Sequence, residues 1–218
     1  MAILVKSSTA DDSKDYWSTT WQCFYDAQKL HGRPFKTDVA AEPLTAKCKR
    51  YFTGLEFLDG MLSGHGVALK KSHLAIAVER GLALVGFDAM LADWGDDYWC
   101  NPPFSHKLKF IKRARVMQAK GYAGMMLLPY EPLSDWWQDN LSEGCIIYEP
   151  KGRYQFYERD GETEKSGANF GSALVSFPVQ KIGESIRIRF NRGIGGYVKP
   201  KKPRSNKISQ KQVDIAVA

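Results

Sequence analysis

The sequence is poor in the residues that build metal centres and disulfide-stapled folds. It holds four Cys and four His among 218 residues, and no two cysteines form a C-x-x-C pair. Metal-ligand spacing is therefore absent, which predicts a protein without a structural zinc. A catalytic Cys–His pair stays open, although no local signature supports one. The thiols are expected to be reduced and partly buried: Cys23, Cys48, Cys100 and Cys145.

Long apolar runs are missing as well. No stretch approaches the ~20 consecutive apolar residues that cross a bilayer. The opening segment, MAILVKSSTADD, turns polar too soon for a signal peptide. These absences predict a cytoplasmic protein with no membrane partner. At 218 residues, 44% apolar and 25% charged, the chain has an ordinary globular composition and enough length for one core.

Acidic residues are scarce near the C-terminus. Ten of the 31 Lys and Arg residues lie within 181–211, against one acid, Glu184, so this stretch carries +9. Asp214 adds −1, which leaves residues 1–180 at −1 of the total +7. We predict a folded domain over 1–180 and a basic, partly disordered segment over 181–218. Two interpretations of that segment stay open: a solvated end, or a polyanion-binding tail that neutralises phosphates without folding.

Strand-like and helix-like segments alternate through the first two-thirds of the chain. This pattern predicts an α/β fold with a mostly parallel sheet flanked by helices. Residues 82–90 fit either a strand or a helix. The helices are expected at 18–32, 70–81, 105–121 and 133–141. The strands are expected at 34–38, 97–100, 122–129, 145–149, 152–158, 172–179 and 185–190.

Residue types at the segment ends sharpen this reading. Ser18 or Thr19 is expected to cap the first helix, and Gly32 to end it. Ser105 is expected to cap the helix at 105–121, which Gly121 closes. The late strands follow one another without long helices between them, so we expect them to pair antiparallel.

A rigid turn, Asn101–Phe104 (NPPF), directly follows the expected strand at 97–100. Proline fixes φ and lacks an N–H donor, so two in a row make a stiff turn and bias Asn101 away from the α region. Ligands of an open α/β sheet sit beyond the carboxyl ends of its strands, where this turn is expected. The turn can hold an amide, a backbone carbonyl and a ring in one array. The plainer alternative is a loop with a helix cap and a core Phe.

The turn and its surroundings resemble phage-type DNA N6-adenine methyltransferases, which use S-adenosylmethionine. NPPF matches their [DNS]-P-P-[YFW] catalytic motif. FKTDVAAEPLTAKCKRYFT, at 35–53, is similar to their F-x-L-D-x-A-A…N-A-K-C…Y-F-T stretch, and LADWGDDYWC, at 91–100, continues it. DYWSTTWQCFYDAQ, at 15–28, resembles the N-terminal cofactor-side segment, without its usual proline. The match runs from about Tyr16 to Phe177, and residues 58–88 look like an insertion.

The resemblance implies a Rossmann-like methyltransferase fold and a set of site residues. The G-x-G loop usual at such a site is absent, so the segment TDVAA must turn with alanines. Asx-turn and helix-cap roles are the structural alternatives for Asp38 and Asp93. Phe170 is a candidate second wall for the target base. The catalytic residues implied are Asn101, Pro102, Pro103 and Phe104. The cofactor-binding residues implied are Trp17, Thr20, Asp38, Ala40, Ala41, Asp93 and Trp94.

The motif suits methylation of an exocyclic amine. The lone pair of adenine N6 is delocalised into the ring, and two acceptors aimed at its N–H groups would free it. The Asn101 side-chain oxygen and the Pro102 carbonyl are the candidates for this preorganised stabilisation. Phe104 would stack on a base flipped out of the duplex, with N6 held in line with the cofactor methyl. The cofactor carries the reactive group, so no metal is required.

Double-stranded DNA is the expected partner. NPPF-type motifs also occur in enzymes that methylate RNA bases or glutamine side chains, so those acceptors stay open, as does an inactive nucleic-acid-binding relative. The resemblance implies a phage or prophage origin and the cytoplasm of a bacterial host. The sequence predicts neither the recognition site nor the oligomeric state. The basic candidates for DNA contact are Lys107, Lys109, Lys112, Arg113, Lys199, Lys201, Lys202 and Arg204. A solvated helix face explains the first four of them equally well.

Overall fold

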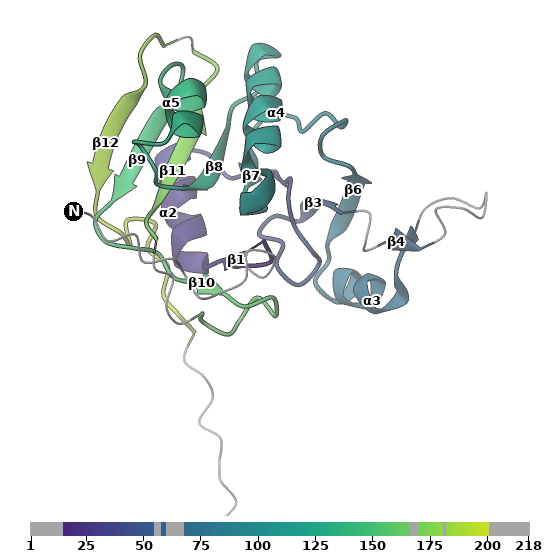
Figure 1. Ribbon diagram of the computed structural model, residues 1–218. Helices are drawn as coiled ribbons and strands as arrows, with labels where there is room; N and C mark the ends of the chain where they lie inside the picture. Colours follow the sequence, from purple (N-terminus) through teal and green to yellow (C-terminus); the bar gives the residue numbers. More distant parts are fainter. Residues whose placement is uncertain (1–14, 55–57, 60–67, 166–169, 181, 201–218) are drawn as a thin grey trace, which may run out of the picture.

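An eight-stranded sheet forms the centre of the molecule, in the order β12-β9-β11-β8-β7-β2-β3-β6. The structure is a computed structural model that describes residues 15–54, 58–59, 68–165, 170–180 and 182–200. The sheet twists strongly between its two edges (Figure 1). Its strands are β2 (Thr37–Asp38), β3 (Arg50–Thr53), β6 (Ala83–Phe87), β7 (Tyr98–Cys100), β8 (Gly124–Pro129), β9 (Ile146–Pro150), β11 (Ser172–Phe177) and β12 (Ile186–Phe190).

Helices and two small ribbons complete the described chain. β1 (Ser18–Thr19) pairs with β10 (Phe156–Tyr157), and β4 (Leu58–Asp59) pairs with β5 (Ala68–Leu69). Within the described ranges, no helix combines the length and apolar character needed to cross a bilayer. The helices are α2 (Trp21–His31), α3 (Lys71–Glu79), α4 (Lys107–Ala119) and α5 (Asp135–Leu141).

Seven of the eight strands run in one direction, and β11 runs against them between β8 and β9. The predicted Rossmann-like α/β fold, a mostly parallel sheet flanked by helices, is confirmed. Antiparallel pairing of the late strands is correct for β11 and wrong for β12, which pairs parallel with β9. The expected strand at 152–158 leaves this sheet altogether, because β10 pairs with β1.

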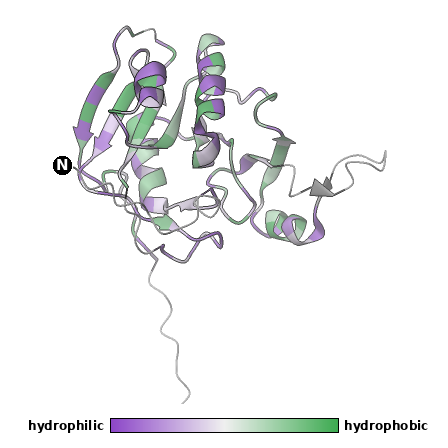
Figure 2. Cartoon of the chain, viewed as in Figure 1, coloured by the Kyte–Doolittle hydropathy of each residue, from purple (hydrophilic) through white to green (hydrophobic). Residues whose placement is uncertain are grey.

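The core lies on both faces of the central strands. Every residue of β8 and β11 is buried, and both strands are apolar along most of their length (Figure 2). α4 and α5 cover one face, through Ile111 and Trp137 among others, while α2 covers the other through Phe24 and Ala27 (Figure 1). Strands buried on both faces read as continuous apolar runs, which is why GMMLLP was recognisable in the sequence.

The helix ends follow local chemistry, with small shifts from expectation. Thr20 caps α2, its hydroxyl accepting from Cys23 N at 3.4 Å, and Gly32 ends the helix at φ 81°. The predicted caps Ser18 and Thr19 lie too early, because they form β1. Ser105 does not cap α4. It lies in a 3-10 turn, Phe104–His106, and donates through its N and Oγ to Asp15 at 3.0 and 2.5 Å.

The segment 58–88, interpreted above as an insertion, contributes to the central sheet. β6 pairs parallel with β3 and forms the sheet edge. α3 precedes it and packs Ala77 against Leu82 and Leu84. The segment therefore supplies an edge strand and the helix of its crossover.

The chain stays folded beyond residue 180, where the predicted domain ended. β12 is an edge strand of the central sheet, and the residues after it pack on α2. Asp26 of α2 is fully buried and accepts from Gly193 N at 2.8 Å and Gly195 N at 2.7 Å. A Cβ at Gly195 would overlap the Tyr25 carbonyl group, so only glycine permits this approach. The basic segment therefore starts from an anchored backbone.

Candidate active site

The strand order reverses at β2, since β3 and β6 follow it on one side and β7 and β8 on the other. Asp38, the last residue of β2, is in register with Trp99 of β7. The two parallel strands therefore end side by side, and the loops after them diverge. This is the position at which open α/β sheets bind ligands. The turn NPPF emerges here, as predicted.

A cavity of about 440 Å³ opens at this edge, a size typical of small-molecule sites. Three buried oxygens in its lining have no hydrogen-bond partner in the described part of the chain: Thr19 Oγ1, Thr53 Oγ1 and Asn101 Oδ1. Because buried polar atoms are almost always paired, these oxygens mark places for ligand donors. Five stretches supply most of the lining: 15–19, 38–42, 52–54, 88–90 and 99–110 in part.

Asn101 is fixed in one orientation. Its Nδ2 donates to the Trp17 carbonyl at 2.9 Å, and this bond leaves Oδ1 as the amide group without a partner in the described chain, on a residue that lines the cavity. The proline pair behind it is stiff, and the Pro103 carbonyl accepts from His106 N at 2.9 Å to start the 3-10 turn. The sequence thus positions a side-chain acceptor with its direction set by a backbone contact 84 residues away.

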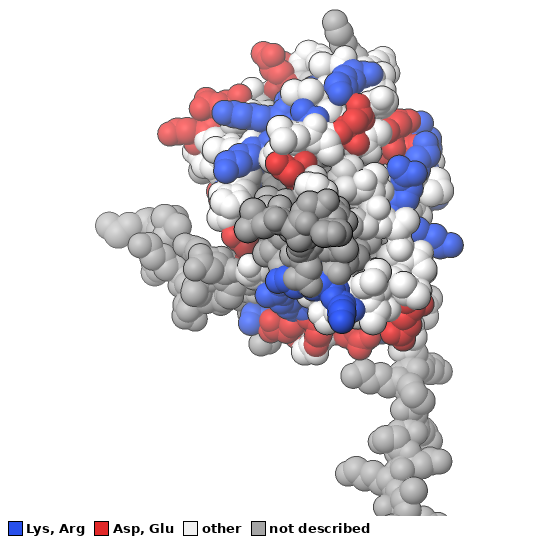
Figure 3. Space-filling view, turned by 90° about the vertical axis from the view of Figure 1, so that its right-hand side faces the viewer, with Lys and Arg blue, Asp and Glu red and all other residues white. Residues whose placement is uncertain are grey.

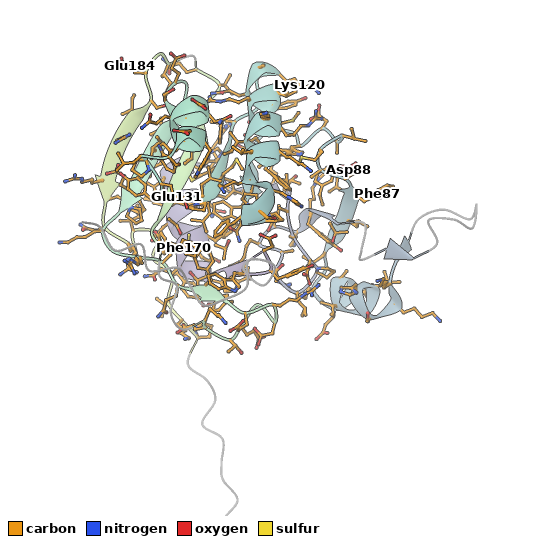
Figure 4. All side chains as sticks on the ribbon, viewed as in Figure 1. Phe87, Asp88, Lys120, Glu131, Phe170 and Glu184 are labelled. Carbon is orange, nitrogen blue, oxygen red and sulfur yellow. The ribbon has the colours of Figure 1, made fainter. Side chains whose placement is uncertain are left out.

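An aromatic cluster lies beside Asn101. Phe170 stacks on Trp17 with ring centroids 5.9 Å apart and planes 6° apart. Phe104 meets Phe170 edge to face at 5.4 Å and meets Phe156 edge to face at 6.0 Å. Phe170 is labelled in Figure 4, near the ends of β9 and β11. The turn thus brings its acceptor and its ring next to two further aromatic rings.

Asp38 sits at the base of the cavity and is 3% exposed. Its carboxylate accepts from Lys47 N at 3.0 Å and Ala40 N at 3.4 Å. Burial raises the pKa of Asp38 to about 6, and these two backbone hydrogen bonds act in the opposite direction. Ala40 and Ala41 line the cavity, and neither has a positive φ. This turn can therefore use alanines where a G-x-G loop would need glycines.

Three of the predicted cofactor residues lie outside the cavity lining. The Thr20 hydroxyl is occupied as the cap of α2. Asp93 accepts from Lys120 Nζ at 2.9 Å, and Lys120 lies near the far end of α4 (Figure 4). Trp94 is 2% exposed and donates from Nε1 to the Ala89 carbonyl at 2.7 Å, so it supports the 88–90 loop from behind. The structure brings the remaining four together at the cavity: Trp17, Asp38, Ala40 and Ala41.

Sequence reasoning missed four charged residues of the lining: Asp15, Glu42, Lys47 and Asp88. Asp88 follows β6 at φ 55°, and its Oδ1 accepts from Met90 N at 3.1 Å. Figure 4 places it at the β6 edge, across the sheet from Phe170. Lys47 lines the cavity near Asp38. Asp88 carried a usable signal, an acid directly after an apolar strand, once 82–90 is assigned as a strand. For Lys47, the only signal in the sequence was its position within the longest stretch that matches the family.

The basic residues of α4 have mixed environments. Lys107 Nζ donates to the Phe104 carbonyl at 3.2 Å, and Arg113 Nη2 donates to the Leu91 and Ala92 carbonyls at 3.0 and 2.5 Å. Lys109 and Lys112 are exposed. On the face that carries α3 and β6, basic and acidic side chains are intermixed (Figure 3).

The DNA-contacting residues predicted in the C-terminal tail fall on both sides of residue 200, the last residue that the structure describes. Lys199 Nζ lies 2.5 Å from Glu164 Oε1. Lys201, Lys202 and Arg204 fall outside the described residues. Among the residues that are described, no group of three or more His, Cys, Asp or Glu is arranged to hold a metal ion.

Comparison with known proteins assigns the chain to a family. A model of the family "DNA N-6-adenine-methyltransferase (Dam)" matches residues 84–191, which include the whole NPPF turn. The chain belongs to this methyltransferase family. It is 25% identical over 182 residues to the DNA N-6-adenine-methyltransferase of Haemophilus phage HP1, covering 80% of this chain and 85% of the phage protein. The resemblance drawn from the motifs is thereby confirmed.

A solved structure is also similar in part. It is described as a predicted O-methyltransferase of Agrobacterium tumefaciens. The similarity covers 72% of this chain and 79% of that one, at 11% identity and a TM-score of 0.38. The Dam family assignment rests on the sequence matches, and the fold on the strand order of the sheet itself.

Proposed function

We propose that the protein transfers a methyl group from S-adenosylmethionine to N6 of an adenine flipped out of double-stranded DNA. The observation that carries this proposal is the state of Asn101. Its Nδ2 is held by the Trp17 carbonyl, and its buried Oδ1 has no partner among the described residues. A buried acceptor left unsatisfied at a cavity costs about 1–3 kcal/mol unless a ligand donor satisfies it. Membership of the Dam family supports adenine in DNA as that donor.

Asn101 would act on the charge that develops during transfer. The N6 lone pair is delocalised into the purine ring, and it becomes available when the amine turns pyramidal. An oxygen fixed beforehand accepts one N–H of the amine and stabilises the positive charge that grows on nitrogen. The Trp17 contact keeps the amide from turning its NH₂ group toward the substrate. The carbonyl of Pro102, held by the rigid turn, is the proposed second acceptor.

The cavity lining suits the methyl donor. S-adenosylmethionine, when bound, supplies an electrophilic methyl group on a positively charged sulfur. Four acids line the cavity (Asp15, Asp38, Glu42 and Asp88) against one lysine, so its field favours a cationic ligand. With a pKa of about 6, Asp38 is mostly ionised at pH 7. Asp88, at the β6 end, has carboxylate acceptors for hydroxyl or amino groups of the adenosine portion.

Flipping of the target base follows from burial. Asn101 Oδ1 is buried, and the Trp17 residue that holds the Asn101 amide stacks on Phe170, which in turn contacts Phe104. A base still stacked in a duplex cannot bring its N6 to such a depth, so it has to leave the helix. The aromatic cluster then replaces part of the lost base stacking.

Removing the Phe104 ring is expected to impair the flipped state. Base–aromatic stacking contributes ~1–3 kcal/mol, so Phe104→Ala should lower the rate of methylation roughly 10-fold or more, while Phe104→Tyr, which keeps a stacking face, should retain most of it. 2-Aminopurine at the target position reports unstacking by a rise in fluorescence. Equal activity and equal signal for the Ala and Tyr variants would argue against stacking on Phe104.

The C-terminal tail is expected to supply affinity without specificity. Ending the chain after Lys199 removes five basic residues and keeps the Asp26 contacts to Gly193 and Gly195. Each phosphate that the protein no longer neutralises makes the slope of log K against log salt shallower by about 0.9. The truncated protein should bind duplex DNA more weakly, with a slope shallower by several units and unchanged turnover at saturating DNA. An unchanged slope in anisotropy titrations would identify a merely solvated end.

The acceptor class is tested by offering all three candidates at once. Tritium from methyl-labelled S-adenosylmethionine should appear in duplex DNA, and not in RNA or in glutamine-containing peptides, when equal amounts are incubated with the protein. Label found mainly in RNA or peptide would overturn the proposed substrate while leaving the methyl-donor site intact.

A further inference from the structure

We propose that Lys47 binds the carboxylate of the cofactor's amino-acid portion, and that Ser18, Lys47 and Asp38 together form a subsite for a zwitterion. The inference rests on the proposed function, because it assumes that the cavity holds S-adenosylmethionine. It adds a residue that fixes the orientation of the ligand in the cavity.

The fold places Lys47 beside the end of β2. Its backbone N–H donates to Asp38 Oδ2 at 3.0 Å, which ties the loop after β2 back onto the strand end. The side chain then passes the start of α2 and the β10 ribbon. Nζ lies 4.4 Å from the centre of the Trp21 ring and 5.5 Å from that of Tyr157.

The ammonium group is buried and poorly satisfied. Lys47 is 9% exposed, and the hydrogen bond that its Nζ makes is a long one, 3.5 Å to Ser18 Oγ. No carboxylate of the described chain lies within 4.0 Å of Nζ. A lysine ammonium has three donors, and a buried one ordinarily pairs with an anion. The two aromatic faces offset part of the cost, because cation–π contacts stabilise a buried cation.

The charged form persists at neutral pH despite burial. Burial, with a smaller contribution from the nearby Arg80, lowers the pKa of Lys47 to about 8, while the Asp38 carboxylate acts in the opposite direction. Lys47 is therefore mostly protonated at pH 7 and can attract an anion at the cavity wall.

A carboxylate attached to an ammonium fits this surrounding better than other anions. Lys47, Ser18 and Asp38 all line the cavity, so an anion site and a cation site lie side by side. An α-amino acid carries both charges on one carbon and satisfies both at once. A phosphate would meet Lys47 but would be repelled by Asp38 and by Glu42. The acidic lining away from Lys47 suits the sulfonium and the ribose hydroxyls.

The test compares ligands with and without the amino-acid portion. Lys47→Met keeps an unbranched apolar side chain of similar length and removes the charge, and Lys49→Met, at an exposed lysine two residues on, is the matched control. Isothermal titration calorimetry measures binding of S-adenosylhomocysteine and of 5′-methylthioadenosine. A charge-assisted hydrogen bond is worth ~1.5–3 kcal/mol, so Lys47→Met should weaken S-adenosylhomocysteine ~10-fold or more, change methylthioadenosine less than ~3-fold, and leave the control like the wild type.

A second binding measurement uses the wild-type protein alone. S-adenosylhomocysteine lacking only its carboxylate should bind ~10-fold or more weakly than the intact ligand. Three results would each overturn the role of Lys47 while leaving the proposed function standing. They are equal losses of affinity for both ligands in Lys47→Met, no loss of affinity for S-adenosylhomocysteine in that variant, and full affinity of the wild type for the decarboxylated ligand. A wild-type protein that binds none of these ligands would overturn the methyl donor itself, and Lys47's role with it.

Discussion

Replacing Asn101 by Ala is expected to lower turnover by ~100-fold or more, with the affinity for S-adenosylhomocysteine nearly unchanged. The substitution removes Oδ1, the buried acceptor that has no partner in the described chain, and that contact is made chiefly in the transition state. A loss in kcat without a loss in cofactor binding separates this role from a structural one. Single-turnover methylation and calorimetry on the same variant supply the two numbers.

Two further variants at asparagine sharpen the result. Asn101→Asp keeps an acceptor but loses the Nδ2 donor to the Trp17 carbonyl, so its activity should lie between wild type and Asn101→Ala. Asn140→Ala is the matched control, because Asn140 Nδ2 also donates to a tryptophan carbonyl, that of Trp136 at 2.8 Å, outside the cavity. Wild-type turnover in Asn101→Ala would mean that Asn101 only holds the β1 segment in place and has no catalytic role.

Asp26→Ala is expected to destabilise the protein by about 3 kcal/mol or more. The buried carboxylate accepts from Tyr154 Oη at 2.6 Å and from two backbone amides, Gly193 N and Gly195 N. The Tyr154 hydroxyl, left buried and unsatisfied, costs about 1–3 kcal/mol, and the two amides, which are less buried, belong to a segment that Asp26 holds against α2. Urea denaturation followed by circular dichroism measures the loss.

Tyr154→Phe serves as the graded control for this change. It removes one of the three donors and leaves the carboxylate paired with both amides, so we expect a loss of about 1 kcal/mol. A loss below about 1 kcal/mol in Asp26→Ala would mean that the segment after β12 is held by other contacts, of which the Tyr25–Tyr197 stack at 5.7 Å is the first candidate.

Parts of the site were predictable because their signals are local. The two prolines of the NPPF turn are enough to predict that it is rigid. Asp38 was recognised because it ends a short strand within the longest matching stretch. β8 was predicted from its apolar run alone. In each case, neighbours in the sequence determine the conformation.

Other parts depend on contacts between distant segments. Asp93 and Trp94 stand only a few residues before β7, yet one binds Lys120 and the other packs behind the 88–90 loop. Charge counting treated residues 181–200 as a tail, because it registers Lys and Arg but not the two glycine amides that donate to Asp26. Lys47 acquires its environment from Trp21 and Tyr157, which no spacing rule connects to it.

The central claim, that Asn101 directs a methyl group to N6 of adenine in DNA, is tested most directly by identifying the methylated nucleoside. Duplex DNA incubated with the protein and S-adenosylmethionine is digested to nucleosides and analysed by mass spectrometry beside the Asn101→Ala reaction. We expect N6-methyl-deoxyadenosine with the wild type and a signal reduced ~100-fold with the variant. N4-methyl-deoxycytidine, another methylated exocyclic amine, as the main product, or equal yields from both proteins, would contradict the account.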